Sequence, residues 1–315
     1  MSTNSIKSIL NSSKSVLIIG HIRPDGDCLG AGLALLFAAK NLGVPCDFVC
    51  DTDPLPIQYS FMNGFEFVNE TKAKEYDTVI AVDCGGSDRM GKYESVLKKA
   101  RQSLNIDHHP SNDMFAKINI VDKCAAAACE IVAKMLLGDG LVDKNIAESL
   151  LVGLSTDTGH FIHSNMRLEI FELAAKLLEF GADYQKVVGG LYKSYSKNQN
   201  MLLGRVIDSA RYFEDDRAGL MVIRQEDLDA CGCGLFDTEG LIGYLMRIKS
   251  VEVAACICEC GKDKYKVGFR SKGRDVNAAA AVFGGGGHKH AAGCMVFGKY
   301  EDVVDKIKKS LTDCF

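Results

Sequence analysis

The first half of the chain alternates short apolar runs with longer segments of helical periodicity, and no other feature restricts its fold as much. Four runs have the length and composition of buried strands: 15–20, 46–50, 77–83 and 103–107. Five segments between and after them have helical periodicity: 28–43, 124–137, 145–154, 167–180 and 183–195. Strands that alternate with helices in this way predict an α/β domain with a mainly parallel sheet flanked by helices.

The pattern changes after the polar stretch YKSYSKNQN at 192–200. Beyond it, 210–224 reads as two strands around an acidic turn, and 251–273 reads as a hairpin. Helical patterns lie at 237–248 and 275–283. The sequence therefore predicts three parts: an N-terminal α/β domain at 1–188, a linker at 189–200 and a smaller α+β domain at 201–315.

Composition excludes several classes of protein. With 315 residues and a net charge of −4, the chain lacks the basic face that grips long duplex nucleic acid, although short anionic ligands at one site stay open. The opening MSTNSIKSIL has no secretory apolar run, and no segment reaches the roughly 18–20 apolar residues of a membrane span. We expect a cytoplasmic protein without membrane contact, whose 13 cysteines are reduced and pack as small core residues.

Two groups of cysteines allow a second interpretation, as zinc ligands. The groups are Cys231 with Cys233, and Cys256 with Cys258 and Cys260. Their C-x-C spacing differs from the usual C-x2-C, and the second group lies in a strand-like run. We therefore favour core thiols over a zinc site.

Histidine and aspartate side chains gather where the apolar runs end. The seven histidines fall into four short clusters: His21, His108 with His109, His160 with His163, and His288 with His290. Aspartates mark the ends of the same kind of segment: Asp25, Asp27, Asp83, Asp107 and Asp157. Any one of them alone would fit a turn or a helix cap.

Taken together, these side chains predict a metal site. The carboxyl ends of parallel strands meet at one edge of a sheet, which is where ligands bind in open α/β folds. Carboxylates and imidazoles suit Mn²⁺ or another divalent first-row ion, and suit Mg²⁺ less well. Two ions about 3.5–4 Å apart, bridged by one carboxylate, would use this many ligands.

The second domain carries two further motifs, VGFRSKG at 267–273 and FGGGGHKHAAG at 283–293. Four consecutive glycines can bring the backbone close to a ligand and point several N–H groups at an anion. A glycine run by itself is more often a flexible loop, but His288 follows it directly and Arg270 offers a fork for phosphate. These motifs favour phosphate binding.

In this order, the motifs HIRPDGD, VD, DHH, TDTG, FRSKG and GGGGHKHAAG resemble those of DHH-family phosphoesterases with the DHH-associated C-terminal domain. The resemblance covers nearly the whole chain. Its length and domain order are similar to the short oligoribonuclease/pAp phosphatase type. The resemblance implies a metal-binding catalytic domain, a substrate-binding domain, and an active site in the cleft between them. One departure is Lys289, where the family often has proline.

The resemblance also implies a role for each site residue. One ion would be held by His21, Asp25 and Asp83, and the other by Asp27, Asp83, His108 and Asp157. Asp107 would orient His108, and His109 would face the phosphate, so Asp107, His108 and His109 form the catalytic group. The substrate's phosphate would be bound by Arg270, Ser271, Gly284, Gly285, Gly286, Gly287 and His288. His160 and His163 stay open as substrate contacts, and His290 has no assigned role.

The expected function is Mn²⁺-dependent hydrolysis of short oligoribonucleotides, removal of phosphate from 3′-phosphoadenosine 5′-phosphate (pAp), or both. The expected partners are therefore short RNA or nucleotide bisphosphates, and a homodimer is allowed. The alternatives are a phosphodiesterase of linear pApA or cyclic dinucleotides, an inorganic pyrophosphatase, and a nucleotide-binding module without turnover. FRSKG and GGGGH argue against the pyrophosphatase, and the full set of ligands argues against a silent module.

Overall fold

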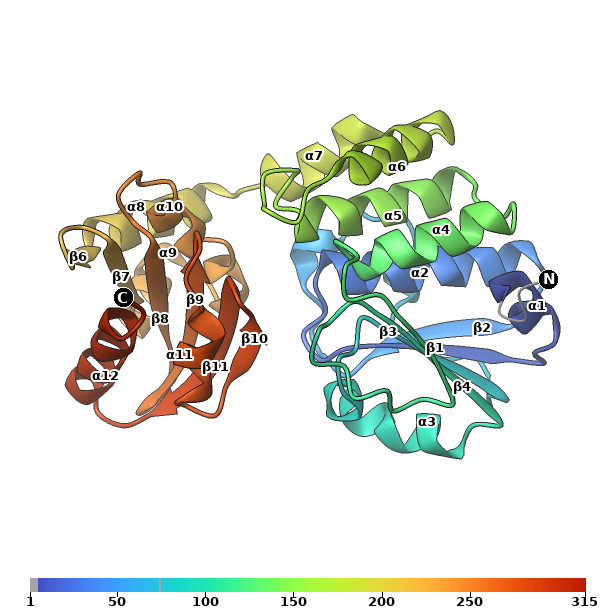
Figure 1. Ribbon diagram of the computed structural model, residues 1–315, viewed down its shortest axis with the longest axis horizontal. Helices are drawn as coiled ribbons and strands as arrows, with labels where there is room; N and C mark the ends of the chain where they lie inside the picture. Colours follow the sequence, from blue (N-terminus) through green and yellow to red (C-terminus); the bar gives the residue numbers. More distant parts are fainter. Residues whose placement is uncertain (1–4, 74) are drawn as a thin grey trace. The chain divides into compact units, whose positions relative to one another are not determined.

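The apolar runs of the first half lie side by side as a parallel sheet in the structure of the protein, a computed structural model that describes residues 5–73 and 75–315 (Figure 1). The sheet has the order β2-β1-β3-β4-β5, and each neighbouring pair is parallel. Its strands are β1 (Val16–Gly20), β2 (Cys46–Cys50), β3 (Thr78–Val82), β4 (Gln102–Asp107) and β5 (Ile118–Val121). The first four agree with the prediction to within one residue at each end.

Strand β5 was not predicted from the sequence. It is an edge strand of four half-buried residues, and it includes the polar Asn119. A strand at the edge of a sheet buries less of its surface, so its sequence need not be uniformly apolar. The apolar signal that identified the other four strands, including the better-buried edge strand β2, is therefore weak here.

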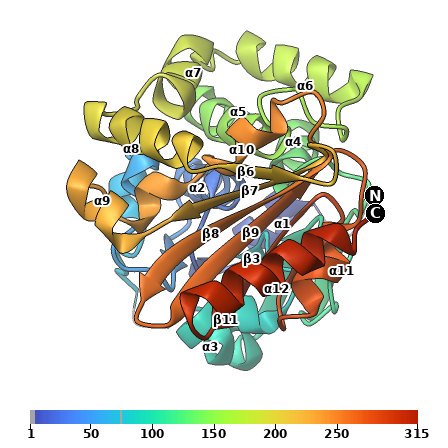
Figure 2. The same ribbon diagram turned by 90° about the vertical axis from the view of Figure 1, so that its left-hand side faces the viewer.

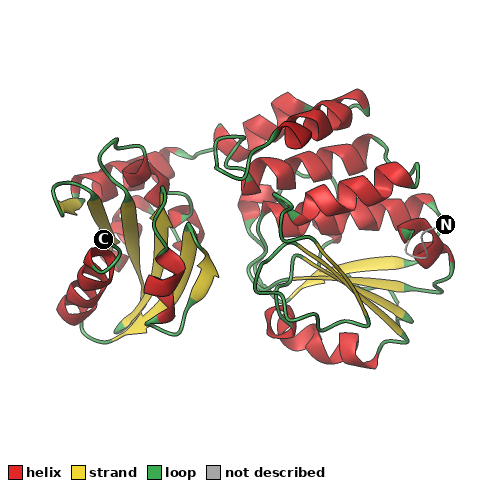
Figure 3. Cartoon of the chain, in the orientation of Figure 1, coloured by secondary structure: helices red, strands yellow, loops and turns green. Residues whose placement is uncertain are grey.

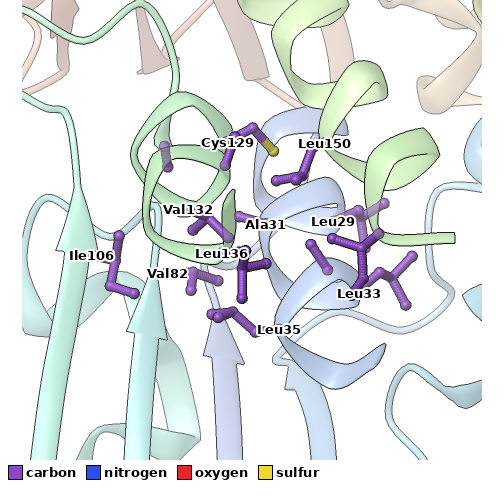
Figure 4. Close-up of a cluster of buried hydrophobic side chains, with 14 of the residues drawn as sticks. Leu29, Ala31, Leu33, Leu35, Val82, Ile106, Cys129, Val132, Leu136 and Leu150 are labelled. Atoms are coloured by element: carbon purple, nitrogen blue, oxygen red, sulfur yellow. The ribbon is translucent and has the colours of Figure 1, made fainter. Parts of the chain in front are cut away.

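Helices cover both faces of this sheet. They are α1 (Ile6–Asn11), α2 (Gly26–Asn41), α3 (Glu94–Lys99), α4 (Ala128–Gly138), α5 (Lys144–Asp157), α6 (Leu168–Glu179) and α7 (Tyr184–Tyr192), with 3-10 turns at Ile57–Tyr59, Phe65–Phe67 and Ser87–Tyr93. The main core lies between the sheet and α2, α4 and α5, where Leu33, Val82 and Leu136 are buried (Figure 4). Helices α6 and α7 pack on α5, and α3 covers the opposite face (Figure 3).

Helix boundaries follow from capping by aspartate. Helix α2 begins two residues before the predicted start, because the Asp25 side chain accepts hydrogen bonds from the N–H groups of Asp27 and Cys28. Helix α4 begins four residues after the predicted start, at Ala128. Asp25 thus has the capping role that the sequence left open, and Asp27 falls in the first turn of α2.

Helices α2 and α5 approach closely because a glycine lies between them. A Cβ added at Gly30 would lie 2.4 Å from the carbonyl oxygen of Ser149, well inside van der Waals contact. The approach brings the start of α2 beside the end of α5: a Cβ added at Gly26 would lie 2.4 Å from Cγ2 of Thr156. The first turn of α2 and the last turn of α5 therefore share one end of the helical layer.

The chain divides between Ser194 and Tyr195 into two units, and the second unit has its own sheet. This sheet has the order β10-β11-β9-β8-β7-β6, and only the β7–β8 pair is parallel (Figure 2). Its strands are β6 (Arg211–Phe213), β7 (Ala218–Ile223), β8 (Val253–Gly261), β9 (Lys264–Ser271), β10 (Gly286–His288) and β11 (Ala291–Phe297). The acidic turn between β6 and β7 and the β8–β9 hairpin were predicted.

Two helices cover one face of the second sheet and three cover the other. Helices α11 (Val276–Ala281) and α12 (Tyr300–Thr312) form one core with the strands. Helices α8 (Lys197–Asp208), α9 (Gln225–Cys231) and α10 (Ile242–Met246) form the other. Helix α8 begins inside the segment expected as a linker. The helix predicted at 237–248 is shorter, because the chain turns at Gly240, whose φ is +79°.

Within the described parts of the chain, 5–73 and 75–315, no helix is long and apolar enough to cross a lipid bilayer.

We predict that Gly30→Ala destabilises the protein. The added methyl group would overlap the backbone of α5, and overpacking of this kind costs about 1–3 kcal/mol in the free energy of unfolding. Gly189→Ala in α7 is the matched control, since among the described residues no atom beyond its chain neighbours and its own helix backbone lies within 4 Å of the added Cβ, and alanine favours a helix. Urea unfolding measures both variants. Equal stability of the two variants would contradict the close α2–α5 packing.

Candidate metal centre

Three neighbouring strands deliver the predicted residues to one edge of the first sheet. His21 follows β1, Asp83 follows β3, and Asp107 ends β4, and these strands are adjacent in the order β1-β3-β4. Helix α2 adds Asp25 and Asp27 at its start, and α5 adds Asp157 as its last residue. Side chains that are far apart in the sequence therefore meet where parallel strands end, as the sequence predicts.

His108 lies at the centre of one group of carboxylates. Its Nε2 atom is 3.3 Å from Oδ2 of Asp157, 3.6 Å from Oδ1 of Asp83 and 3.8 Å from Oδ2 of Asp27. Its Nδ1 atom lies 3.3 Å from the carbonyl oxygen of Ala125, which can only accept a hydrogen bond, so Nδ1 carries the proton. The lone pair of Nε2 is thus directed at three acidic oxygens.

His21 is arranged in the same way on the other side of Asp83. Its Nδ1 atom lies 2.9 Å from the carbonyl oxygen of Ile22, and its Nε2 atom lies 3.3 Å from Oδ2 of Asp83. Oδ1 of Asp25 is 3.7 Å from the same nitrogen. The two imidazoles therefore face different oxygens of one carboxylate, that of Asp83.

Asp83 is held in a conformation that few residues adopt. Its φ is +55°, in the left-handed region where aspartate and asparagine are the most tolerated side chains after glycine. The residue is buried, and among the residues that the structure describes, its Oδ1 atom has no hydrogen-bond partner. A buried carboxylate oxygen without a donor is costly unless a cation satisfies it.

Asp27 joins two helices at the same place. Its Oδ2 and Oδ1 atoms accept hydrogen bonds of 2.6 and 2.8 Å from the N–H groups of Ala128 and Cys129, at the start of α4. The segment before α4 is held in turn by Glu130, which accepts from the N–H of Ala126, and by Asn165, which donates to the carbonyl oxygens of Ala126 and Asp157. The segment at 125–129 therefore contacts two of the site's side chains, Asp27 through its N–H groups and His108 through the carbonyl oxygen of Ala125.

The charges at this site are unbalanced without a cation. Burial, followed by the charge of Asp83, raises the pKa of Asp27 to about 7. Burial and the charges of Asp27, Asp25 and Asp83 raise the pKa of Asp157 well above its usual value. Carboxylates that repel one another in a buried place, with imidazole nitrogens directed at them, are the donor set of a divalent ion. The residues present therefore fit a metal site.

The roles expected of Asp107 and His108 need one correction. We expected Asp107 to orient His108, but Oδ1 of Asp107 lies 2.7 Å from Nδ1 of His109 instead. Side chains two residues apart share a side of an extended chain, whereas neighbours point to opposite sides. Asn112, which the sequence analysis missed, donates to Oδ2 of Asp107 over 2.6 Å and to the carbonyl oxygen of Cys84.

Cys28 is a second residue that the sequence analysis missed. Its thiol lies close enough to His21 and Asp83 for the three side chains to form a possible ligand group, and it directly follows Asp27 in the sequence. Within the first unit, the other such groups are Asp27 with His108 and Asp157, and Asp83 with Asp107 and His109. All the cysteines are free, and within residues 5–73 and 75–315 no such group includes those considered as zinc ligands.

The glycine run of the second unit is mostly structural. The N–H groups of Gly284 and Gly285 donate to the carbonyl oxygens of Ala281 and Ala280, which ends α11 in the pattern of a Schellman cap. Gly284 has a φ of +71°, the left-handed conformation this cap requires. The implied phosphate nest of Gly284–Gly287 therefore loses two of its donors, because the N–H groups of Gly284 and Gly285 are already hydrogen bonded.

The remaining predicted residues of the second unit lie at the end of its sheet. Gly286, Gly287 and His288 form the edge strand β10. His288 pairs with Ala291, which pairs with Arg270, so the two basic side chains share a row and a face of the sheet with a small residue between them. Ser271 has a local role, since its hydroxyl donates to the carbonyl oxygen of Arg274 and accepts from the N–H of Gly273.

Comparison with known proteins gives two family matches. Residues 15–154 match the DHH family, N-terminal domain, and residues 237–315 match the DHHA1 domain. A Thermus thermophilus protein named bifunctional oligoribonuclease and PAP phosphatase NrnA is 29% identical over 313 residues, which cover 94% of this chain and 90% of that protein. A Mycoplasma genitalium protein of the same name is 31% identical and covers 66% of this chain and 70% of its own length.

Solved structures share the fold. A Bacteroides fragilis protein described as exopolyphosphatase-related superposes with a TM-score of 0.91 at 23% identity, covering 98% of this chain and 94% of its own. RecJ from Thermus thermophilus in complex with Mn²⁺ has a TM-score of 0.52 at 13% identity, covering 97% of this chain and 53% of that one.

We predict that Mn²⁺ stabilises the protein more at pH 8 than at pH 6. A carboxyl pKa that folding raises favours the folded state at low pH, and this stability is lost as the pH rises through about 7 for Asp27. The melting temperature of the metal-free protein should therefore fall between pH 6 and pH 8. Bound Mn²⁺ should raise the melting temperature again. At a free Mn²⁺ concentration of 100 times the Kd, binding adds about 2.7 kcal/mol to the free energy of unfolding.

Thermal melting with and without Mn²⁺ at the two pH values measures this difference. Asp157→Asn should reduce the fall, since it removes one of the repelling charges. Asp215→Asn changes an exposed aspartate of the second unit and should behave as the parent protein does. An increase in melting temperature with Mn²⁺ that is as large at pH 6 as at pH 8 would argue against the carboxylate cluster as the binding site.

Proposed function

Because this chain belongs to the DHH family and carries a DHHA1 domain, we propose that it hydrolyses phosphoester bonds in short oligoribonucleotides and in pAp. The relatives that match over most of their length are named for these two activities. The single observation that carries the chemistry is the Asp83 carboxylate, whose two oxygens face His21 and His108 separately. A carboxylate shared in this way is what a two-ion centre requires.

We assign two divalent ions, Mn²⁺ before Mg²⁺, to the first unit. His21, Asp25 and Asp83 would hold one ion, and Asp27, Asp83, His108 and Asp157 the other. Imidazole nitrogen among the donors favours Mn²⁺ over Mg²⁺. The bound ions would lower the pKa of an attacking water molecule and offset negative charge on the phosphoryl oxygens.

His109 is the residue that we assign to the phosphate. The hydrogen bond from its Nδ1 atom to Asp107 fixes the orientation of the ring. Burial lowers the pKa of His109, but the hydrogen bond to Asp107 and the charge of Asp83 outweigh burial and raise it. A protonated imidazole in this place would donate to a phosphoryl oxygen and would favour the charge that develops there. Asp107 acts through His109, and Asn112 through Asp107.

The second unit would bind the rest of the substrate. We assign metal-dependent chemistry to residues 1–188 and substrate binding to residues 201–315. Arg270 and His288 share one row of the sheet, so together they offer a guanidinium fork and an imidazole to a phosphate group. Gly286 and Gly287 lie at the exposed edge beside His288.

We predict that Asp83→Asn abolishes turnover while the protein stays folded. Asparagine tolerates the positive φ of this position and removes the charge that both ions would share. The rate with Mn²⁺ should fall by roughly 10³-fold or more. Asp215→Asn is a matched control, because it makes the same change at an exposed residue with a φ of +54°. Full activity in a folded Asp83→Asn protein would overturn the two-ion assignment.

A substrate panel with Mn²⁺ tests the proposed specificity. We expect turnover of pAp and of RNA of two to five nucleotides, and a rate for a 24-nucleotide RNA that is lower by about tenfold or more. Preference for the long RNA would contradict the short-substrate proposal. Linear pApA and cyclic di-AMP belong in the same panel, since faster turnover of either would identify a dinucleotide phosphodiesterase. Binding without turnover of any substrate would identify a silent nucleotide-binding module.

A further inference from the structure

Five aromatic rings gather beside the end of α5, next to Asp157. They belong to His160, Phe161, Phe171, Tyr184 and Tyr192. Two pairs are stacked: His160 with Tyr184, with centroids 5.9 Å apart, and Phe161 with Phe171, with centroids 5.7 Å apart. The adjacent rings of His160 and Phe161 join the pairs at 5.6 Å. We call these five residues the aromatic platform.

A strained turn holds the platform in place. His160 and Phe161 have φ values of +59° and +64°, which bulky side chains seldom adopt. Hydrogen bonds maintain this conformation: the N–H of His160 donates to the carbonyl oxygen of Ser155, and that of Phe161 to the hydroxyl of Thr158. Strain that the surrounding structure maintains is concentrated at functional sites, so this turn is a candidate for one.

The ring of His160 serves as a flat surface and not as a metal ligand. Its Nδ1 atom lies 3.0 Å from the hydroxyl of Ser155, and its Nε2 atom lies 3.2 Å from the hydroxyl of Tyr184. Both ring nitrogens are thus engaged by neighbouring hydroxyl groups. Burial lowers the pKa of His160, which keeps the imidazole neutral near pH 7. The ring is fixed, uncharged and stacked.

The outer ring of each stacked pair is exposed to solvent. Tyr184 is 38% exposed and Phe171 is 52% exposed, whereas His160 and Phe161 behind them are half-buried. Aromatic rings grouped at a protein surface mark interaction sites, because a ligand that covers them removes apolar surface from water. Flat rings with one open face are the surfaces on which proteins stack nucleobases.

We propose that the aromatic platform stacks on a nucleobase of the substrate, with Tyr184 and Phe171 as the contact rings. The proposal rests on the function proposed above, and it adds a base-binding subsite to the metal centre. His160 follows Asp157 by three residues, so their Cα atoms are no more than about 11 Å apart. A base on the platform would therefore belong to the nucleotide whose phosphate is held at the ions, or to its neighbour.

The test compares ligands with and without a base. Titration calorimetry on the Mn²⁺-loaded protein would measure the Kd of adenosine 5′-monophosphate and of ribose 5-phosphate. Tyr184→Leu and Phe171→Leu remove a ring and retain an apolar side chain, and Tyr184→Phe retains the ring but loses the hydroxyl. Phe180→Leu is the matched control, because Phe180 is 39% exposed at the end of α6 and lies outside the platform.

We expect each ring-removing variant to weaken binding of the adenosine ligand by about 5- to 100-fold, the usual worth of one stacked base. Binding of ribose 5-phosphate should stay within about twofold, and Tyr184→Phe and Phe180→Leu should resemble the parent protein. With a dinucleotide substrate, loss of the ring in Tyr184→Leu or Phe171→Leu should raise KM more than it lowers kcat.

Three results would overturn the base-binding proposal, and the first two concern the comparison of the ligands. One is a parent protein that binds the adenosine ligand no more tightly than ribose 5-phosphate, and the other is an equal loss for both ligands in Tyr184→Leu and Phe171→Leu. Unchanged nucleotide binding in both variants would likewise reject a base subsite, and would leave the platform as a protein-contact surface. A further outcome is a parent protein that hydrolyses no phosphoester and yet binds adenosine 5′-monophosphate more tightly than ribose 5-phosphate, with this preference lost in Tyr184→Leu. That result would contradict the proposed function and support the base-binding platform.

Discussion

The carboxylate of Asp27 is the interaction on which the geometry of the first unit depends. It belongs to the first turn of α2, accepts two backbone N–H groups at the start of α4, and lies so close to α5 that a Cβ on Gly153 would approach its Oδ1 atom to 2.7 Å. Hydrogen bonds and the positive end of a helix favour its charged form. Burial and the charge of Asp83 oppose that form and outweigh them, since the pKa of Asp27 is raised to about 7. A divalent cation would remove this conflict, so the carboxylate that assembles three helices also belongs to a group of side chains that could hold a metal ion.

The sequence was sufficient to predict four of the five strands of the first sheet, β1 to β4, and the residues that meet at its edge. Both depend on strong and local signals, namely uniform apolar runs and the polar residues that follow them. The partner of Asp107 was not predictable in the same way, because the choice between His108 and His109 depends on the direction of each side chain where β4 ends. Asn112 and Cys28 were missed for a related reason: an amide in a turn and a thiol in an apolar helix give no distinct signal until the fold brings them to the site.

The glycine run shows how one pattern can meet two physical requirements. Consecutive glycines predict an anion-binding backbone, but they also suit the end of a helix and a strand packed closely on its neighbour. Here Gly284 ends α11, and a Cβ on Gly285 would lie 2.2 Å from the carbonyl oxygen of Gly293. The sequence cannot distinguish these uses because each needs only the absence of a side chain. The pairing of His288, Ala291 and Arg270 across three strands is a property of register, which no single segment encodes.

The edges of the second sheet carry a consequence for the behaviour of the protein in a crowded solution. Both edge strands, β6 and β10, are only three residues long. An edge strand exposes unpaired N–H and C=O groups that another chain can extend into an intermolecular sheet, and short edges limit this risk. Both edges of the six-stranded sheet are therefore too short to pair with a long strand from another chain. The exposed glycine backbone at β10 is therefore too short for a second copy of the chain to add a long strand there.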